Sequence, residues 1–147
     1  MQADQQKGFT LIELLLSVAL IVIVASFSIP LTLKWRSSTD LSLATQAVAL
    51  SARRAQLLSQ SMKEDSTWGI KIDELGSTVF RGSSYLNRDS SYDELSVFRS
   101  IENVSGATEF VFLAPSGNTG SAGTVILNDK QNSSSSIVIN RLGFAIY

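Results

Sequence analysis

The sequence predicts an α+β protein in which a long N-terminal helix packs on an antiparallel β-sheet or β-sandwich of about six to seven strands. Three observations predict this class. Residues 9–33 form an almost continuous apolar run, and apolar side chains then recur every three or four residues to about Met62. From Thr67 onward, short β-type runs are separated by Gly, Ser, Asn and Asp. With 147 residues, the chain has room for one soluble domain after the apolar run.

The apolar run at residues 9–33 is long enough for one membrane-spanning helix. A bilayer core of roughly 30 Å requires about 20 apolar residues in a helix. The polar residues 1–8 precede the run as a separate leader. A secretory signal has its small-residue cleavage site after a shorter apolar region, whereas here Gly8 precedes the run and a carboxylate, Glu13, lies inside it.

The helical pattern continues over residues 34–62, which we expect to lie on the soluble domain. The predicted buried stripe consists of Leu41, Ala44, Val48, Ala52, Ala55 and Leu58, and the opposite face receives Gln46, Arg53, Arg54 and Gln60. Pro30 lies within the pattern, where a proline removes one backbone hydrogen bond and crowds the preceding turn. We therefore expect a helix kink at Pro30, with or without a functional role.

Residues 63–147 are expected to form a globular β domain. The candidate strands lie within residues 68–72, 79–80, 95–101, 110–113, 124–127, 137–139 and 144–147. Because the runs at 110–113 and 124–127 are apolar on both faces, we expect these strands to be central in the sheet.

Four segments between the candidate strands have the composition of loops or turns. Residues 82–94 and 129–136 are polar, so we expect them to form exposed loops. Residues 115–120 and 140–143 contain the Gly and Asn typical of tight connections. We therefore expect hairpin turns at both places.

The composition disfavours several classes of function. The sequence contains neither cysteine nor histidine, which removes thiolate metal ligands, the commonest zinc ligand and the commonest general base. We therefore expect that the protein is not an enzyme and that it binds neither a cofactor nor a metal ion. Twelve basic and thirteen acidic side chains give a net charge of -1, with no basic run to neutralise phosphates, so nucleic acid is not an expected partner.

The segment Gly8-Phe9-Thr10-Leu11-Ile12-Glu13 resembles the class III signal of type IV prepilins and of the pseudopilins of type II secretion and competence systems. The resemblance implies cleavage after Gly8 by a prepilin peptidase, methylation of the new amine on Phe9 and a role of Glu13 in assembly. It also implies the pilin fold, a single-pass location in the bacterial inner membrane with the C-terminal domain extracytoplasmic, and later incorporation into a filament. The implied partners are other pilin or pseudopilin subunits, the peptidase and an inner-membrane assembly platform.

Glu13 has a physical role that agrees with this resemblance. A carboxylate inside a membrane helix costs about 2.5–3.5 kcal/mol on insertion scales and usually has a partner. Cleavage before Phe9 creates an N-terminal cation, and pairing it with Glu13 of a neighbouring subunit would neutralise both charges and set the register between helices. The alternative is that Glu13 only marks the water-facing end of the helix, where its charge favours the helix N-terminus.

The second half of the chain resembles the minor pseudopilin H of type II secretion and the FimT pilins. The resemblance rests on residues 44–61, 68–72, 112–117, 123–127 and 137–143. It implies a β-sandwich packed on the helix and a place near the filament tip. Some FimT-type pilins bind DNA through basic residues near the C-terminus, and here Arg141 is the one cation of that region.

Calcium binding is a further possibility that the resemblance raises, because major pseudopilins bind this ion in an acidic loop. Asp89, Asp93 and Glu94 are the acidic residues of the corresponding polar segment. Their spacing fits no calcium-loop motif, so we interpret them as solvated loop carboxylates.

Two hypotheses for the whole protein remain. The first is a structural subunit, minor rather than major, of a type IV pilus-like filament used in type II secretion, pilus biogenesis or DNA uptake. The second is a membrane-anchored extracytoplasmic binding or adhesive domain whose helix is only an anchor. Lys7 before the apolar run and Lys34 and Arg36 after it do not fix the orientation by charge alone. Removal of the leader distinguishes the two hypotheses.

Overall fold

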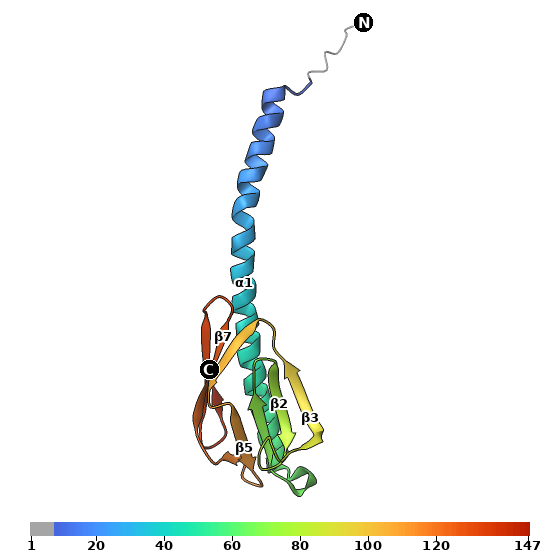
Figure 1. The fold of residues 1–147 in the computed structure, drawn as a ribbon, viewed down its shortest axis with the longest axis vertical. Coiled ribbons are helices and arrows are strands. Elements are labelled where there is room, and N and C mark those ends of the chain that lie inside the picture. The colour runs from blue at the N-terminus through green and yellow to red at the C-terminus, as the bar shows by residue number, and fades with distance from the viewer. Residues whose placement is uncertain (1–7) are drawn as a thin grey trace. The chain divides into compact units, whose positions relative to one another are not determined.

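One long helix and two antiparallel sheets make up the part of the chain that the structure describes (Figure 1). The computed structural model describes the backbone of residues 8–147 and the side chains of residues 8–26 and 38–147. The helix, α1, spans Leu11–Gln60. The predicted α+β class is confirmed. The chain divides into two compact units, Met1–Trp35 and Arg36–Tyr147, which are described separately below.

Nine strands follow α1 and a short 3-10 helix, η1 (Lys63–Asp65), within residues 8–147. The strands are β1 (Trp68–Ile72), β2 (Gly76–Arg81), β3 (Asp89–Val97), β4 (Ile101–Gly106), β5 (Glu109–Leu113), β6 (Asn118–Thr119), β7 (Gly123–Asp129), β8 (Ser134–Ile139) and β9 (Ala145–Ile146). The first sheet has the order β3-β2-β1-β5-β6 and the second has the order β4-β7-β8-β9. Strands β5 and β7 each lie between two neighbours, as predicted for central strands.

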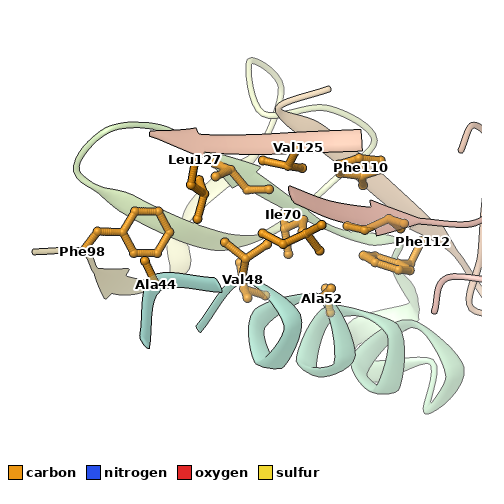
Figure 2. Close-up of a cluster of buried hydrophobic side chains, with 14 of the residues drawn as sticks. Ala44, Val48, Ala52, Ile70, Phe98, Phe110, Phe112, Val125 and Leu127 are labelled. Atoms are coloured by element: carbon orange, nitrogen blue, oxygen red, sulfur yellow. The ribbon is translucent and has the colours of Figure 1, made fainter. Parts of the chain in front are cut away.

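The domain half of α1 packs its apolar stripe against both sheets. All six residues of the predicted stripe are buried, and so are apolar residues of both sheets, among them Ile70 and Phe112 of the first sheet and Val125 and Leu127 of the second. Figure 2 shows Ala44, Val48 and Ala52 of the helix facing these side chains. The four polar residues assigned to the opposite face of the helix are exposed. The 3.6-residue period therefore identified the packed face correctly.

Polar side chains of α1 also bond to the first sheet and to two turns. The buried Ser59 hydroxyl donates to the Phe112 carbonyl at 2.7 Å and accepts the Trp68 N–H at 2.9 Å, so one side chain joins β5 and β1 to the helix. The Gln56 amide donates to the carbonyls of Gly117 at 3.1 Å and Leu142 at 2.8 Å. These bonds satisfy buried polar groups that would otherwise destabilise the fold.

The predicted loop at residues 82–94 is wrong over its second half, because β3 begins at Asp89. β3 is an edge strand of the first sheet, and its first residues are exposed. A strand there does not need the apolar alternation that we used to recognise strands. The expected single strand at residues 95–101 is also wrong, because β3 ends at Val97 and β4 starts a new pairing in the second sheet at Ile101. Between them, Ser100 has a positive φ of 62°.

The predicted loop at residues 129–136 is shorter than expected. β7 reaches Asp129 and β8 begins at Ser134. Asp129 is buried, and its Oδ1 accepts the backbone N–H groups of Gln131 and Ser133, both at 2.8 Å. The carboxylate thus closes a tight β7–β8 turn, which composition alone indicated only as a polar segment.

Within the part of the chain that the structure describes, no helix is long and apolar enough to cross a membrane. The expected membrane segment, residues 9–33, continues into residues 27–33, whose side chains are outside the described set. The expected kink at Pro30 also lies outside the described side chains. The backbone of α1 is helical from Leu11 to Gln60.

Candidate functional site

The candidate site lies at the beginning of α1 and starts with two residues that precede the helix. Gly8 is exposed, and a side chain added there would meet no atom of the described residues within 4 Å. Phe9 is 85% exposed. Since the described fold would tolerate a side chain at position 8, any requirement for glycine must come from a molecule that binds this segment.

Thr10 caps the N-terminus of α1. Its Oγ1 accepts the backbone N–H of Glu13 at 3.4 Å, and its carbonyl accepts the N–H of Leu14 at 3.2 Å. A Thr followed three residues later by Glu is the capping-box pattern, which satisfies N–H groups that the first turn leaves unpaired. We did not predict this role for Thr10, although the Thr-x-x-Glu spacing is visible in the sequence.

The Glu13 carboxylate lies in the first turn of α1 and is exposed. Among the described residues, no donor forms a hydrogen bond or an ion pair with its side-chain oxygens. A negative charge in the first turn interacts favourably with the helix dipole. The carboxylate is therefore held at a fixed place on the helix and is free to accept a donor from another molecule.

Apolar side chains cover every side of α1 around Glu13. Each of the following residues has half or more of its surface exposed: Phe9, Leu11, Ile12, Leu14, Leu15, Leu16, Val18, Leu20, Ile21, Val22, Ile23 and Val24. The hydroxyls of Ser17 and Ser26 donate to the carbonyls of Glu13 at 2.8 Å and Val22 at 2.7 Å. The hydroxyls thus find acceptors within the helix, so the segment suits an apolar environment everywhere except at Glu13.

The three acidic residues that we considered for calcium each lie close to an arginine. Arg81 is 3.8 Å from Asp89, Arg88 is 2.8 Å from Asp93, and Arg54 is 3.1 Å from Glu94. Hydrogen bonding to Asp93 raises the pKa of Arg88 above its ordinary value. No group of three possible metal ligands occurs among the residues whose side chains are described. The structure therefore places these carboxylates in separate ion pairs.

Arg141, the residue considered for DNA contact, is exposed in the turn between β8 and β9. Its backbone carbonyl accepts the N–H of Thr119 at 2.9 Å. The turn itself forms as predicted for residues 140–143, because Gly143 N–H donates to the Asn140 carbonyl at 2.9 Å and the Asn140 side chain accepts the N–H groups of Leu142 and Phe144, both at 3.0 Å.

Comparison with known proteins identifies the N-terminal segment. Residues 4–29 match the model of the prokaryotic N-terminal methylation motif, the class III signal of type IV prepilin-like proteins. No curated protein and no solved structure matches the chain significantly. The matched residues include Gly8, Phe9 and Glu13. The motif supports a type IV pilin-like or pseudopilin subunit that associates with other pilin subunits and a prepilin peptidase.

Proposed function

We propose that this protein is a minor subunit of a type IV pilus-like filament and assembles through the first half of α1 after its leader is removed. The observation that carries this proposal is the described segment at residues 11–26, which is apolar on all sides and holds one carboxylate, Glu13, without a partner in its own chain. This segment lies within the matched methylation motif.

The proposed assembly begins at the inner membrane. Residues 9–33 anchor the precursor with its domain outside the cytoplasm, and the peptidase cuts between Gly8 and Phe9 on the cytoplasmic side. Gly8 suits this cut because its backbone enters a narrow active site without a side chain. Methylation then occurs on the new amine of Phe9.

The new amine and Glu13 select the register between neighbouring subunits. Removal of residues 1–8 leaves a cation on Phe9, and the Glu13 carboxylate of the next subunit is the partner that this cation meets. In a low dielectric, an unpaired carboxylate or amine is costly. The pair therefore acts chiefly by penalising registers in which either charge stays unpaired.

The filament belongs to a secretion pseudopilus, a surface pilus or a DNA-uptake pilus. The resemblance of the second half to the minor pseudopilin H and the FimT pilins favours a minor subunit near the tip. The exposed Arg141 provides a single cation in its turn, which gives little support for DNA binding.

The test is to follow the full chain in bacteria that have a prepilin peptidase and an assembly platform, and in the same strain without the peptidase. We expect the processed protein in the sheared filament fraction of the first strain and only the precursor, in the membrane fraction, of the second. A protein that stays in the membrane with residues 1–7 attached in both strains would contradict the proposal and fit the anchored binding domain instead.

A further inference from the structure

The loop between β2 and β3 presents one leucine, Leu86, which is 92% exposed. Contacts on both sides of this residue fix the loop. The Tyr85 N–H donates to Oε1 of Glu109 at 2.9 Å, and the Tyr85 ring packs edge-on against Phe80 with the ring centroids 5.6 Å apart. The guanidinium of Arg88 lies 3.8 Å from the centre of the Tyr85 ring, and its Nη1 donates to the Tyr85 carbonyl at 2.9 Å. Leu86 is therefore a preorganised apolar projection.

An apolar hollow of about 220 Å³ lies at the other end of β3, between that strand and α1. Its apolar lining consists of Leu43, Ala44, Ala47, Val97 and Phe98. An apolar cavity of about 150 Å³ holds a benzene molecule, so this hollow has room for a leucine side chain. We refer to it as the β3 hollow.

Leu86 and the β3 hollow lie at opposite ends of one strand, which runs along an edge of the first sheet (Figure 1). β3 begins three residues after Leu86, and its last residue lines the hollow. A nine-residue strand spans about 30 Å. β3 is antiparallel to the domain half of α1, because Arg54 bonds to Glu94 of β3, whereas the earlier helix residue Asp40 accepts from Ser100, after β3. A shift along α1 by about the length of β3 therefore brings Leu86 of one copy to the β3 hollow of another.

The charged residues at the two ends of β3 complement each other. Asp89 follows the loop, and its side chain is 49% exposed in spite of a long ion pair of 3.8 Å. Arg99 lines the β3 hollow and is exposed, and no described carboxylate lies within ion-pair distance of its guanidinium. Asp40, the other charged residue of the hollow, accepts the Ser100 hydroxyl at 3.0 Å. A copy whose Leu86 enters the hollow thus brings Asp89 towards Arg99, and opposite charges meet.

We propose that Leu86 of one copy inserts into the β3 hollow of the next copy along the filament. The contact joins two different surfaces, so it repeats head to tail, whereas a two-fold pair would end at two copies. Both the leucine and the apolar lining leave water, which favours the contact. This inference rests on the proposed function, because a filament holds its subunits parallel and shifted along one direction. It adds that two copies of this chain follow one another there.

Cysteine cross-linking tests the contact directly, because the natural sequence has no cysteine. Two full-length chains with different tags, one with Leu86→Cys and the other with Val97→Cys, are expressed in the same cells, and sheared filaments are oxidised and run on a non-reducing gel. We expect a covalent dimer that contains both tags, and no dimer when either variant is expressed alone.

The control for cross-linking replaces Val97→Cys by Leu113→Cys, a site on β5 that is 47% exposed and lies outside the β3 hollow. Filaments without the Leu86–Val97 dimer would overturn the contact. So would an equal amount of dimer in the control or from Leu86→Cys alone, because the hollow would then have no special place in it.

Serine variants measure how much Leu86 contributes to assembly. Leu86→Ser removes the projecting side chain, whereas Leu75→Ser removes a leucine that is 75% exposed in the β1–β2 turn. Because a leucine is buried in the proposed contact, we expect Leu86→Ser to lower the filament fraction by roughly tenfold. Leu75→Ser should leave the fraction unchanged, and so should Leu86→Met, which keeps an apolar side chain of similar volume. Equal filament fractions for the two serine variants would overturn the inference.

The same cells separate this inference from the proposed function. If the unsubstituted chain is cleaved and enters filaments while Leu86→Ser does so equally well, only the contact at the β3 hollow is wrong. If the unsubstituted chain keeps its leader or never reaches the filament fraction, the proposed function fails, and the inference fails with it.

Discussion

Glu13 is a charged side chain within an apolar helical segment. It is the charged residue of a helical stretch in which both serine hydroxyls are bonded to the helix's own carbonyls. The Thr10 hydroxyl oxygen accepts the Glu13 backbone N–H at 3.4 Å, and the Glu13 carboxylate forms no hydrogen bond or ion pair among the described residues. A charged side chain in an apolar membrane segment is energetically costly, so such a residue is typically functional and has a partner.

We predict that Glu13→Ala is cleaved normally but assembles poorly. The substitution removes the acceptor for the Phe9 amine, whose unpaired charge then costs about 2.5–3.5 kcal/mol in an apolar environment, so the filament fraction should fall by roughly tenfold or more. Mass spectrometry of the N-terminus gives cleavage, and immunoblots of sheared filaments give assembly. Ser17→Ala is the control, because its hydroxyl bonds within the helix at 2.8 Å. Normal assembly of Glu13→Ala would refute the assigned role.

The elements of the fold differ in how clearly the sequence indicated them. The buried face of α1 was predictable because Val48, Ala52 and Ala55 sit in a one-sided environment with a helical period. Two sheet features were not predictable by alternation: the first half of β3 lies on a sheet edge, and the two-residue strand β6 pairs through residues 118 and 119 inside a predicted turn. Whether such a segment forms a strand depends on the neighbouring strand with which it pairs, and not on its local composition alone.

The contacts that lock the turns to α1 were also hidden in the sequence. Gln56 and Ser59 are polar, and nothing in their spacing shows that one bonds the carbonyls of Gly117 and Leu142 and the other bonds β1 and β5. For Thr10, the sequence contains the Thr-x-x-Glu spacing of a helix cap, but it does not show which hydrogen bonds form there. Long-range hydrogen bonds follow from the tertiary arrangement, which a local pattern does not contain.

We predict that Gly143→Ala destabilises the domain. Gly143 has φ +85°, and a Cβ there would lie 2.6 Å from Nε2 of Gln56 and 2.7 Å from the carbonyl oxygen of Gly117. Backbone strain and loss of the Gln56 contacts should lower the free energy of unfolding by about 1–3 kcal/mol. Thermal unfolding measures this. Gly120→Ala is the control, because no atom in the described part of the chain lies within 4 Å of the position that its Cβ would take. An unfolding midpoint for Gly143→Ala equal to that of the control would contradict the geometry.

The two units of the molecule differ in where their apolar side chains lie. Every residue of the core cluster lies between Leu41 and Ile139, within the unit Arg36–Tyr147. The segment at residues 11–26 has no such core and exposes its apolar side chains instead. The sequence therefore indicated a β domain packed on a helix. It also indicated that residues 11–26 require an apolar environment or a partner.

We predict that a fragment of residues 36–147 folds without the first unit. It keeps the whole core cluster, so its circular dichroism should show mainly β-structure with one helix, and it should unfold in a single cooperative transition. Because the fragment lacks the apolar segment, it should remain soluble at concentrations that precipitate the full chain in the absence of detergent. A mostly helical spectrum or a gradual loss of signal on heating would show that the core depends on the first unit.

The mass of the N-terminal peptide of the protein recovered from filament-forming cells tests the proposed assembly most directly. If the leader is removed and the first half of α1 enters the filament, that peptide begins at Phe9 and carries one methyl group on its amine. A peptide that still begins within residues 1–7 would contradict the proposal, because no cation would then be available for Glu13 of the neighbouring subunit.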